Sequence, residues 1–294
     1  MDDNLTTVPA AADTAAGARR SGQHPPLVLR GSLDLGLPLS KYHYLFRLLA
    51  ERDLKERYAG SWMGLSWSVL QPLALFSIYL LVFSVFLKVR PDDIYANVPF
   101  PLWLLAGMTP WLFVSEILSR APTQVTEHYR MVTKNAFPNE MLPTVTALSA
   151  LSNHLLSLLL LWIPLLYCGF QPAGSMLWLP AWTVVLLVFV VGLAWLLSAV
   201  GVYFRDLTHL SSLMAMVWSF STPVFYPEQR VPASYHWILA CNPLYVMVRG
   251  YRAALLGHPG SAEDLAMGAA WALAAAAVGA LAFRRLKRGF ADLL

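Results

Sequence analysis

The sequence predicts an all-α integral membrane protein, on the strength of its composition and its apolar pattern. The 294 residues are 57% hydrophobic and only 13% charged, whereas soluble domains carry about 25% charged residues. Six apolar stretches are each close to the roughly 20 residues that cross a bilayer as a helix. They are Trp67–Leu87, Pro99–Leu118, Val145–Cys168, Leu177–Phe204, Leu207–Phe225 and Leu265–Phe283. The fifth is the weakest, because a proline interrupts it and serines dilute it.

The chain before the first span divides into a tail and a helix. Residues 1–38 open with a stretch rich in Ala, Thr and Gly that lacks the apolar run of a signal peptide, which predicts a disordered tail. Residues 39–60 predict an amphipathic helix, with Tyr42, Phe46 and Leu49 on one face and charged residues on the other. Directly before a membrane span, such a helix lies in the interface plane. A soluble core helix is the alternative.

Lysine and arginine predict the orientation of the spans. With both termini in the cytoplasm, 16 of the 21 Lys and Arg residues fall on the inner side, as the positive-inside rule favours. An even number of spans agrees with that placement. In the first span, Pro72 predicts a kink, because proline removes one hydrogen bond of the helix.

The loop of residues 120–143 is then the long cytoplasmic one. It predicts a helix over Gln124–Lys134, followed by a short element between two prolines. We expect Phe137, Met141 and Leu142 to be exposed below the membrane, as a segment that docks into a partner's groove requires. An ordinary polar connection is the alternative.

The outer segment of residues 221–260 predicts short re-entrant helices. Residues 236–248 are too apolar for a free loop and too short to cross, and the segment is divided by Pro223, Pro227, Pro232 and Pro243. Irregular backbone at membrane depth needs to be buried in protein or to line a cavity. Tyr226 and Tyr235 lie here, either in an aromatic belt at the membrane surface or as rings that stack on a sugar chain.

The sequence contains few residues whose spacing matches a catalytic, nucleotide-binding or metal-binding motif. No GxxxxGK[ST] loop is present to hold ATP phosphates, and Cys168 and Cys241 form no metal-ligand pattern with histidine. Asn153 and His154 in the third span are typical of helix–helix contacts or of a cavity lining rather than of a metal site. Glu116 is an acid within or near the second span, where it either serves function or reaches water.

Five collinear motifs carry a resemblance to a known family. Residues 52–72, RDLKERYAGSWMGLSWSVLQP, resemble the opening segment of type-2 ABC exporters of polysaccharides, with Met63 where leucine is usual. Residues 134–143, KNAFPNEMLP, resemble the coupling element of that family. The other matches are VYFRDLTHL at 202–210, TPVFYP at 222–227 and NPLYVMVRGYRAALLG at 242–257. Together the motifs lie within residues 40–285.

The resemblance implies that residues 61–294 form the permease subunit of an exporter in the bacterial inner membrane. Two copies would form a channel for a lipid-linked polysaccharide such as O-antigen, capsule or teichoic acid. ATP and Mg²⁺ would bind to two copies of a separate ATPase subunit, and no cofactor, metal or nucleic acid is expected in this chain.

The resemblance also implies roles for individual residues. Six residues would couple the ATPase to the channel: Phe137, Pro138, Asn139, Glu140, Met141 and Leu142. Three basic residues would meet the lipid diphosphate or acidic headgroups: Arg52, Lys55 and Arg57. Four rings would lie near the sugar path: Trp62, Trp67, Tyr226 and Tyr235.

Two other classes of function stay open. An ABC-2 permease for a drug or a simple lipid would carry a closed apolar pocket instead of a wide aromatic path. A membrane-embedded transferase would need paired acids at one membrane face. The pairs Asp92–Asp93 and Glu263–Asp264 lie in outer loops without an accompanying motif.

Overall fold

The computed structural model describes residues 47–53, 61–91, 93–132, 138–169 and 174–293. The chain separates into a unit of residues 1–39 and a second unit, Ser40–Leu294, and every described residue belongs to the second. The tail predicted for residues 1–38 therefore lies outside the described residues. Throughout the described ranges the regular structure is helical, without strands.

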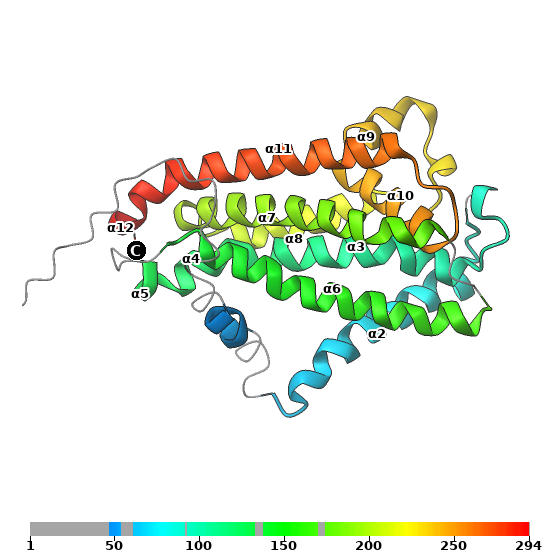
Figure 1. Cartoon of the computed structure of the whole chain (residues 1–294), viewed down its shortest axis with the longest axis horizontal. Coiled ribbons are helices and arrows are strands. Elements are labelled where there is room, and N and C mark those ends of the chain that lie inside the picture. The colour runs from blue at the N-terminus through cyan, green and yellow to red at the C-terminus, as the bar shows by residue number, and fades with distance from the viewer. Residues whose placement is uncertain (1–46, 54–60, 92, 133–137, 170–173, 294) are drawn as a thin grey trace, which may run out of the picture. The chain divides into compact units, whose positions relative to one another are not determined.

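Within the described ranges, five helical segments are long and apolar enough to cross a membrane. Their helices are α2 (Trp67–Leu80) with its π-helical continuation η2 (Leu81–Phe86), α3 (Phe100–Arg120), α6 (Met141–Tyr167), α7 (Leu179–Tyr203) and α11 (Ala262–Leu286). They confirm five of the six predicted spans. Figure 1 shows α3, α6, α7 and α11 running side by side.

Short helices connect the long ones at the two ends of the bundle. They are η1 (Gly64–Ser66), η3 (Asp93–Tyr95), η4 (Ala121–Thr123), α4 (Gln124–Glu127), α5 (Tyr129–Val132), η5 (Gly174–Trp178), η6 (Glu228–Arg230), η7 (Ala233–Tyr235), α9 (His236–Ala240), α10 (Pro243–Leu255), η8 (Lys287–Gly289) and α12 (Phe290–Leu293). In Figure 1, α4, α5 and α12 gather at one end, and α9 and α10 at the other.

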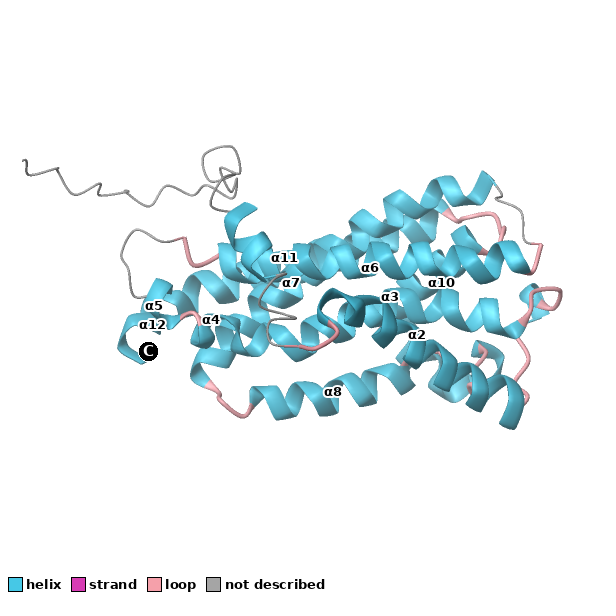
Figure 2. Ribbon diagram, turned by 90° about the horizontal axis from the view of Figure 1, so that it is seen from below, coloured by secondary structure: helices cyan, strands magenta, loops and turns pink. Residues whose placement is uncertain are grey.

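The sixth predicted span is the short helix α8 (Leu207–Ser221), which lies at the margin of the bundle (Figure 2). Its 15 residues rise about 1.5 Å each, or about 22 Å in all, against a hydrocarbon core of about 30 Å. The helix ends because Thr222 is extended, as expected for a residue that precedes a proline. The prediction that this helix continues to Phe225 is wrong.

Helices α7 and α11 approach each other through glycine. A Cβ atom on Gly192 would lie 2.4 Å from the backbone of Ala275, and one on Gly279 would lie 2.1 Å from the carbonyl oxygen of Gly192. Small residues are what allow membrane helices to pack backbone to backbone. These two glycines set the distance between the two helices.

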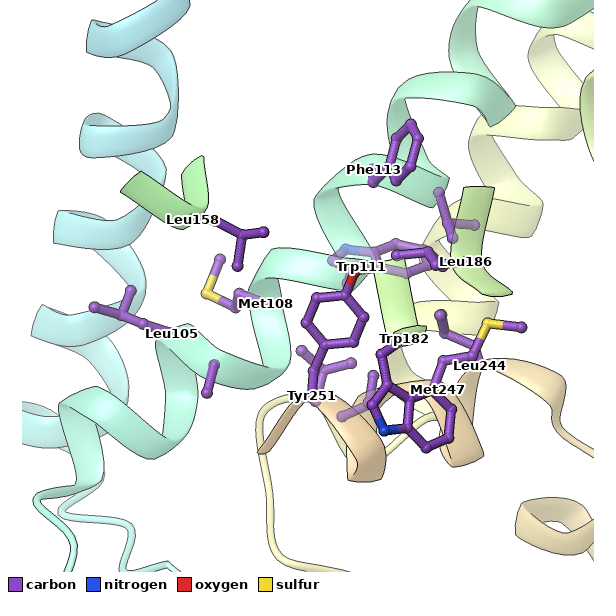
Figure 3. Close-up of a cluster of buried hydrophobic side chains, with 14 of the residues drawn as sticks. Leu105, Met108, Trp111, Phe113, Leu158, Trp182, Leu186, Leu244, Met247 and Tyr251 are labelled. Atoms are coloured by element: carbon purple, nitrogen blue, oxygen red, sulfur yellow. The ribbon is translucent and has the colours of Figure 1, made fainter. Parts of the chain in front are cut away.

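The buried core lies where α3, α7 and α10 meet (Figure 3). Trp182 of α7 is 1% exposed and fills the space left by two glycines. A Cβ on Gly250 would lie 2.0 Å from its ring, and a Cβ on Gly268 would lie 2.8 Å from it. The bulk of one indole therefore joins α7 to both α10 and α11.

Part of the predicted amphipathic helix is within the described residues. Residues 47–53 are helical, with Leu49 buried and Leu48 exposed. Leu49 packs with Met141 and Val145 at the start of α6. Leu49 of the predicted apolar face therefore meets the protein, whereas Tyr42 and Phe46 lie outside the described residues.

Candidate functional site

The predicted coupling segment is fixed to the bundle through Glu140. Its carboxylate forms an ion pair with Lys287 of η8. The indole N–H of Trp195, on α7, donates to the Glu140 carbonyl oxygen at 3.3 Å and to the Thr144 hydroxyl at 3.0 Å. These contacts connect Glu140 to α7 and to η8, which follows α11.

The expectation that Met141 and Leu142 are exposed is wrong. They are 4% and 3% exposed, since both belong to the first turn of α6. Met141 packs with Leu49, and Leu142 packs in a cluster that includes Phe283 and Phe290. Pro138, Asn139 and Glu140 are half-buried, and Phe137 lies outside the described residues. Any docking surface here consists of residues that precede α6.

The three predicted headgroup residues are only partly described. Arg52 is exposed at the end of the helix of residues 47–53, whereas Lys55 and Arg57 lie outside the described residues. Next to Arg52, Asp53 accepts a hydrogen bond from Arg120 of α3 at 2.7 Å. This ion pair attaches the N-terminal helix to the end of α3.

The four rings predicted along the sugar path do not come together. Trp67 is the first residue of α2 and Trp62 lies in the turn before η1, with 44% and 99% of the residue exposed. Tyr226 and Tyr235 follow α8, and the Tyr226 hydroxyl donates to the Phe220 carbonyl oxygen at 2.6 Å. Among the ring contacts of the described residues, none joins two of these four.

A different set of rings stacks between the far end of α2 and the segment after α8. Tyr79 lies over Phe225 with ring centroids 4.7 Å apart, and Phe83 lies 5.5 Å from the same ring. Phe220 adds a tilted contact at 5.9 Å. The four-residue spacing of Tyr79 and Phe83 places them on one helix face, but nothing in the sequence identifies Phe225 as their partner.

Arg252 of α10 holds the segment after α8 in place. It is 3% exposed and donates to the carbonyl oxygens of Pro223 and Val224, both at 2.8 Å. Its guanidinium lies 3.5 Å from the ring of Trp103 on α3, a cation–π contact. The arginine therefore satisfies backbone carbonyls that have no helix partner, as buried irregular backbone requires.

Asn242 makes a second connection in the same region. Its side-chain oxygen caps α10 by accepting from the Leu244 N–H at 3.0 Å, and also accepts from the Trp218 indole at 2.9 Å. Its amide donates to the Thr222 hydroxyl at 2.8 Å. One side chain thus joins the end of α8 to the start of α10.

The outer face of α10 carries two more polar contacts. Tyr245 donates its hydroxyl to the Glu228 carboxylate, and Arg249 pairs with Asp264 of α11 at 2.7 Å. Burial, ahead of the hydrogen bond to Glu228, raises the pKa of the Tyr245 phenol. The phenol therefore stays a donor, and α10 is bound to both neighbouring segments.

The polar residues of the spans connect helices, as predicted for Asn153 and His154. The Asn153 amide donates to both carboxylate oxygens of Glu116, at 3.3 and 3.1 Å, across α6 and α3. His154 hydrogen-bonds the Tyr251 hydroxyl of α10 at 2.9 Å. Glu116 therefore points into the protein, beside a cavity between α2, α3 and α6.

These observations together define a membrane protein of several spans with a buried, non-helical segment at one end. The family model described as ABC-2 type transporter matches residues 44–256. The chain belongs to the ABC-2 type transporter family. The matched residues lie within the range 40–285 that contains the five motifs.

Curated relatives carry more specific names. The chain is 31% identical to the O-antigen export system permease protein RfbA of Myxococcus xanthus over 75% of this chain and 83% of that protein. It is 26% identical to the protein of the same name from Klebsiella pneumoniae, over 85% of this chain and 96% of that one. It is 23% identical to the polysialic acid transport protein KpsM of Escherichia coli, over 70% of this chain and 78% of that protein.

Proposed function

We propose that this chain is the permease subunit of an ATP-driven exporter that moves a lipid-linked polysaccharide, O-antigen before others, across the bacterial inner membrane. The observation that carries the proposal is the match to permeases named for O-antigen export over 83% and 96% of their own lengths. Capsule export is the second candidate, because a polysialic acid transport protein also matches, at 23% identity.

ATP would bind to a separate ATPase subunit, present in two copies beneath a homodimer of this chain. The exposed apolar surfaces of α8 and α2 support the proposal that a second copy of the chain binds there. On α8, four exposed residues at helical spacing form one stripe: Leu210, Leu213, Met214 and Val217. Within the most apolar stretch of α2, 6% of the residues are buried. Two copies facing each other along α2 and α8 would cover these surfaces and enclose a channel.

In this dimer α8 would be the sixth span, extended to the outer surface by the segment that Arg252 holds. The buried Arg252 and the capped α10 support the prediction that residues 221–260 re-enter the membrane. Both termini would be cytoplasmic. The basic residues Arg284, Arg285, Lys287 and Arg288 support this side, since they follow the apolar part of α11.

The ATPase would act on the segment before α6. Phe137, Pro138, Asn139 and Glu140 would contact it, and Met141 and Leu142 would pass the movement into α6 from their buried positions. Arg52, Lys55 and Arg57 would meet the diphosphate of the lipid. Trp67, at the start of α2, lies beside the polar cavity and remains a candidate for the sugar path, together with Trp62, Tyr226 and Tyr235.

Deletion of the gene tests the function. We expect the deletion strain to lose its surface polysaccharide and to recover it with the wild-type gene, as measured by gel electrophoresis of surface glycans. Normal surface polysaccharide in the deletion strain would overturn the proposal.

Complementation with Phe137→Ala should fail while the protein remains in the membrane. Tyr167→Ala is the matched control, since that ring is 92% exposed at the other end of α6.

The headgroup role has its own test. Arg52→Glu combined with Arg57→Glu should weaken substrate-stimulated ATPase activity of the purified complex, because two attractive charges become repulsive to a diphosphate. Unchanged stimulation in the double variant would remove the headgroup role and leave the export function standing.

A further inference from the structure

A polar cavity of about 490 Å³ lies between α2, α3 and α6. This volume falls within the range of about 300–1,000 Å³ that is typical of small-molecule sites. Ten of its fifteen lining residues are Ser, Gln, Asn, His, Glu or Arg, although all three helices are apolar enough to span a membrane. Polar groups at this depth need hydrogen-bond partners, so the cavity is built for something other than a lipid tail.

The charges at the cavity are already balanced. Glu116 accepts from Asn153 and, at 3.3 Å, from Arg120, whose other nitrogen donates to Asp53 at 2.7 Å. Glu116 and Arg120 are the only carboxylate and guanidinium among the described lining residues, and the imidazole of His154 hydrogen-bonds the Tyr251 hydroxyl. A phosphate would approach an arginine that two carboxylates share, and would gain little attraction. The electrostatics favour a neutral ligand.

The lining offers the groups that a neutral, hydroxyl-rich ligand needs. Gln71 and Ser68 contribute from α2, facing Asn153 and Ser157 of α6 across the cavity. Trp67 also lines it and is 44% exposed, so its ring offers an apolar face beside polar groups. Hydroxyls on a ring with an apolar face are the chemistry of a sugar.

We propose that this cavity binds a short segment of sugar chain, so that α2, α3 and α6 form a carbohydrate subsite within each copy of the permease. The inference rests on the proposed export function and adds to it a place where the sugar itself is recognised. Asn153 positions the Glu116 carboxylate between α6 and α3, and Trp67 contacts one face of the sugar. Helix α2 forms one wall of the subsite.

Cysteine protection tests the site in the complete complex, with the ATPase partner, in nanodiscs. Cys168 and Cys241 are exposed and are first replaced by alanine. Ser115→Cys then places a thiol in the cavity lining, and Ser152→Cys, exposed on α6 outside the lining, is the matched control. The reagent is a water-soluble methanethiosulfonate. The probes are the lipid-free oligosaccharide released from the bacterium's own surface polysaccharide and, separately, a short-chain polyprenyl diphosphate.

We expect the cavity thiol to react, and its rate to fall about tenfold with oligosaccharide at ten times its Kd. The polyprenyl diphosphate should leave the rate unchanged, and the control thiol should respond to neither probe. A cavity thiol that stays unreactive, that reacts without protection, or that only the diphosphate protects would overturn the carbohydrate subsite.

A pair of export variants separates this inference from the proposed function. Asn153→Leu should reduce the rate of polysaccharide export about tenfold, as the loss of hydrogen bonds to a charged group predicts, while Ser152→Leu exports normally. If the wild-type gene restores surface polysaccharide but Asn153→Leu exports as fast as wild type, the subsite is wrong and the export function stands. If deletion of the gene leaves the polysaccharide normal, both are wrong.

Discussion

Helix α2 with its continuation η2 spans 20 residues, and α3, the next long helix along the chain, spans 21, yet they are packed in opposite ways. In the most apolar stretch of α3, 78% of the residues are buried inside the protein, whereas in α2 the share is 6%. Helix α3 contacts α6, α7, α8 and α10. Helix α2 contacts α3 and α6 only sparsely, and its far end is held by the ring stack on Phe225.

Helix α3 belongs to a tightly packed scaffold, whereas α2 has a surface that is available to a partner. In the scaffold, glycines bring backbones together and one arginine holds irregular backbone, so small changes cannot be absorbed. The apolar surface of α2 is exposed within one copy of the chain, and a neighbouring copy or lipid covers it in the membrane. Mutations in the two regions should therefore fail in different ways.

The largest effect is expected where α7 and α11 touch. Gly192→Leu places a side chain against the α11 backbone, which has no room for a Cβ, so we expect no folded protein in the membrane fraction. The measurement is the monodisperse yield in detergent. Gly174→Ala is the control, because a Cβ there meets nothing within 4 Å. Equal yields of the two variants would show that α7 and α11 can move apart to accept a side chain, contrary to what their packing implies.

Loss of the Arg252 side chain should be nearly as damaging. Arg252→Met removes hydrogen bonds to two buried carbonyl oxygens, which predicts a loss of about 2–4 kcal/mol in unfolding free energy. Arg249→Met breaks a pair whose arginine side chain is 47% exposed, and should cost at most about 1 kcal/mol. Thermal unfolding in detergent measures both. A similar loss in the two variants would contradict the role of Arg252 as the anchor of the outer segment.

A smaller effect is expected at the ring stack that holds α2. Tyr79→Leu keeps an apolar side chain but removes a ring contact at 4.7 Å, worth about 0.5–1.5 kcal/mol. We expect faster proteolysis near α2 in the purified protein, with little change in the unfolding temperature of the bundle. A lower unfolding temperature without faster proteolysis would place Tyr79 in the scaffold instead.

The smallest effect on folding is expected on the exposed face of α2. Ile78 is 57% exposed, so Ile78→Ala should change the unfolding free energy by less than about 0.5 kcal/mol. If α2 faces a second copy, the same change should lower the yield of cross-linked dimer in native membranes. An unchanged dimer yield would place lipid, and not a second copy, at this position.

The sequence predicted the spans better than it predicted the sites. Hydropathy located five long helices to within four residues at each end, because length and apolar content decide whether a helix crosses a membrane. The exposure of Met141 and Leu142 was predicted wrongly, since both residues looked like part of a loop. They begin α6, and Leu49, Phe283 and Phe290 cover them from segments far away in the chain.

The sequence by itself determined the positions of five long apolar helices and the family motifs, because each of these depends on residues that are close along the chain. Only the tertiary structure decided that α8 is short, that Phe225 stacks on Tyr79 and that Glu116 accepts a hydrogen bond from Asn153 beside a cavity. Those features depend on contacts between residues that are far apart in sequence. Apolar periodicity carries no information about which distant residue fills a given space, so packing alone decides it.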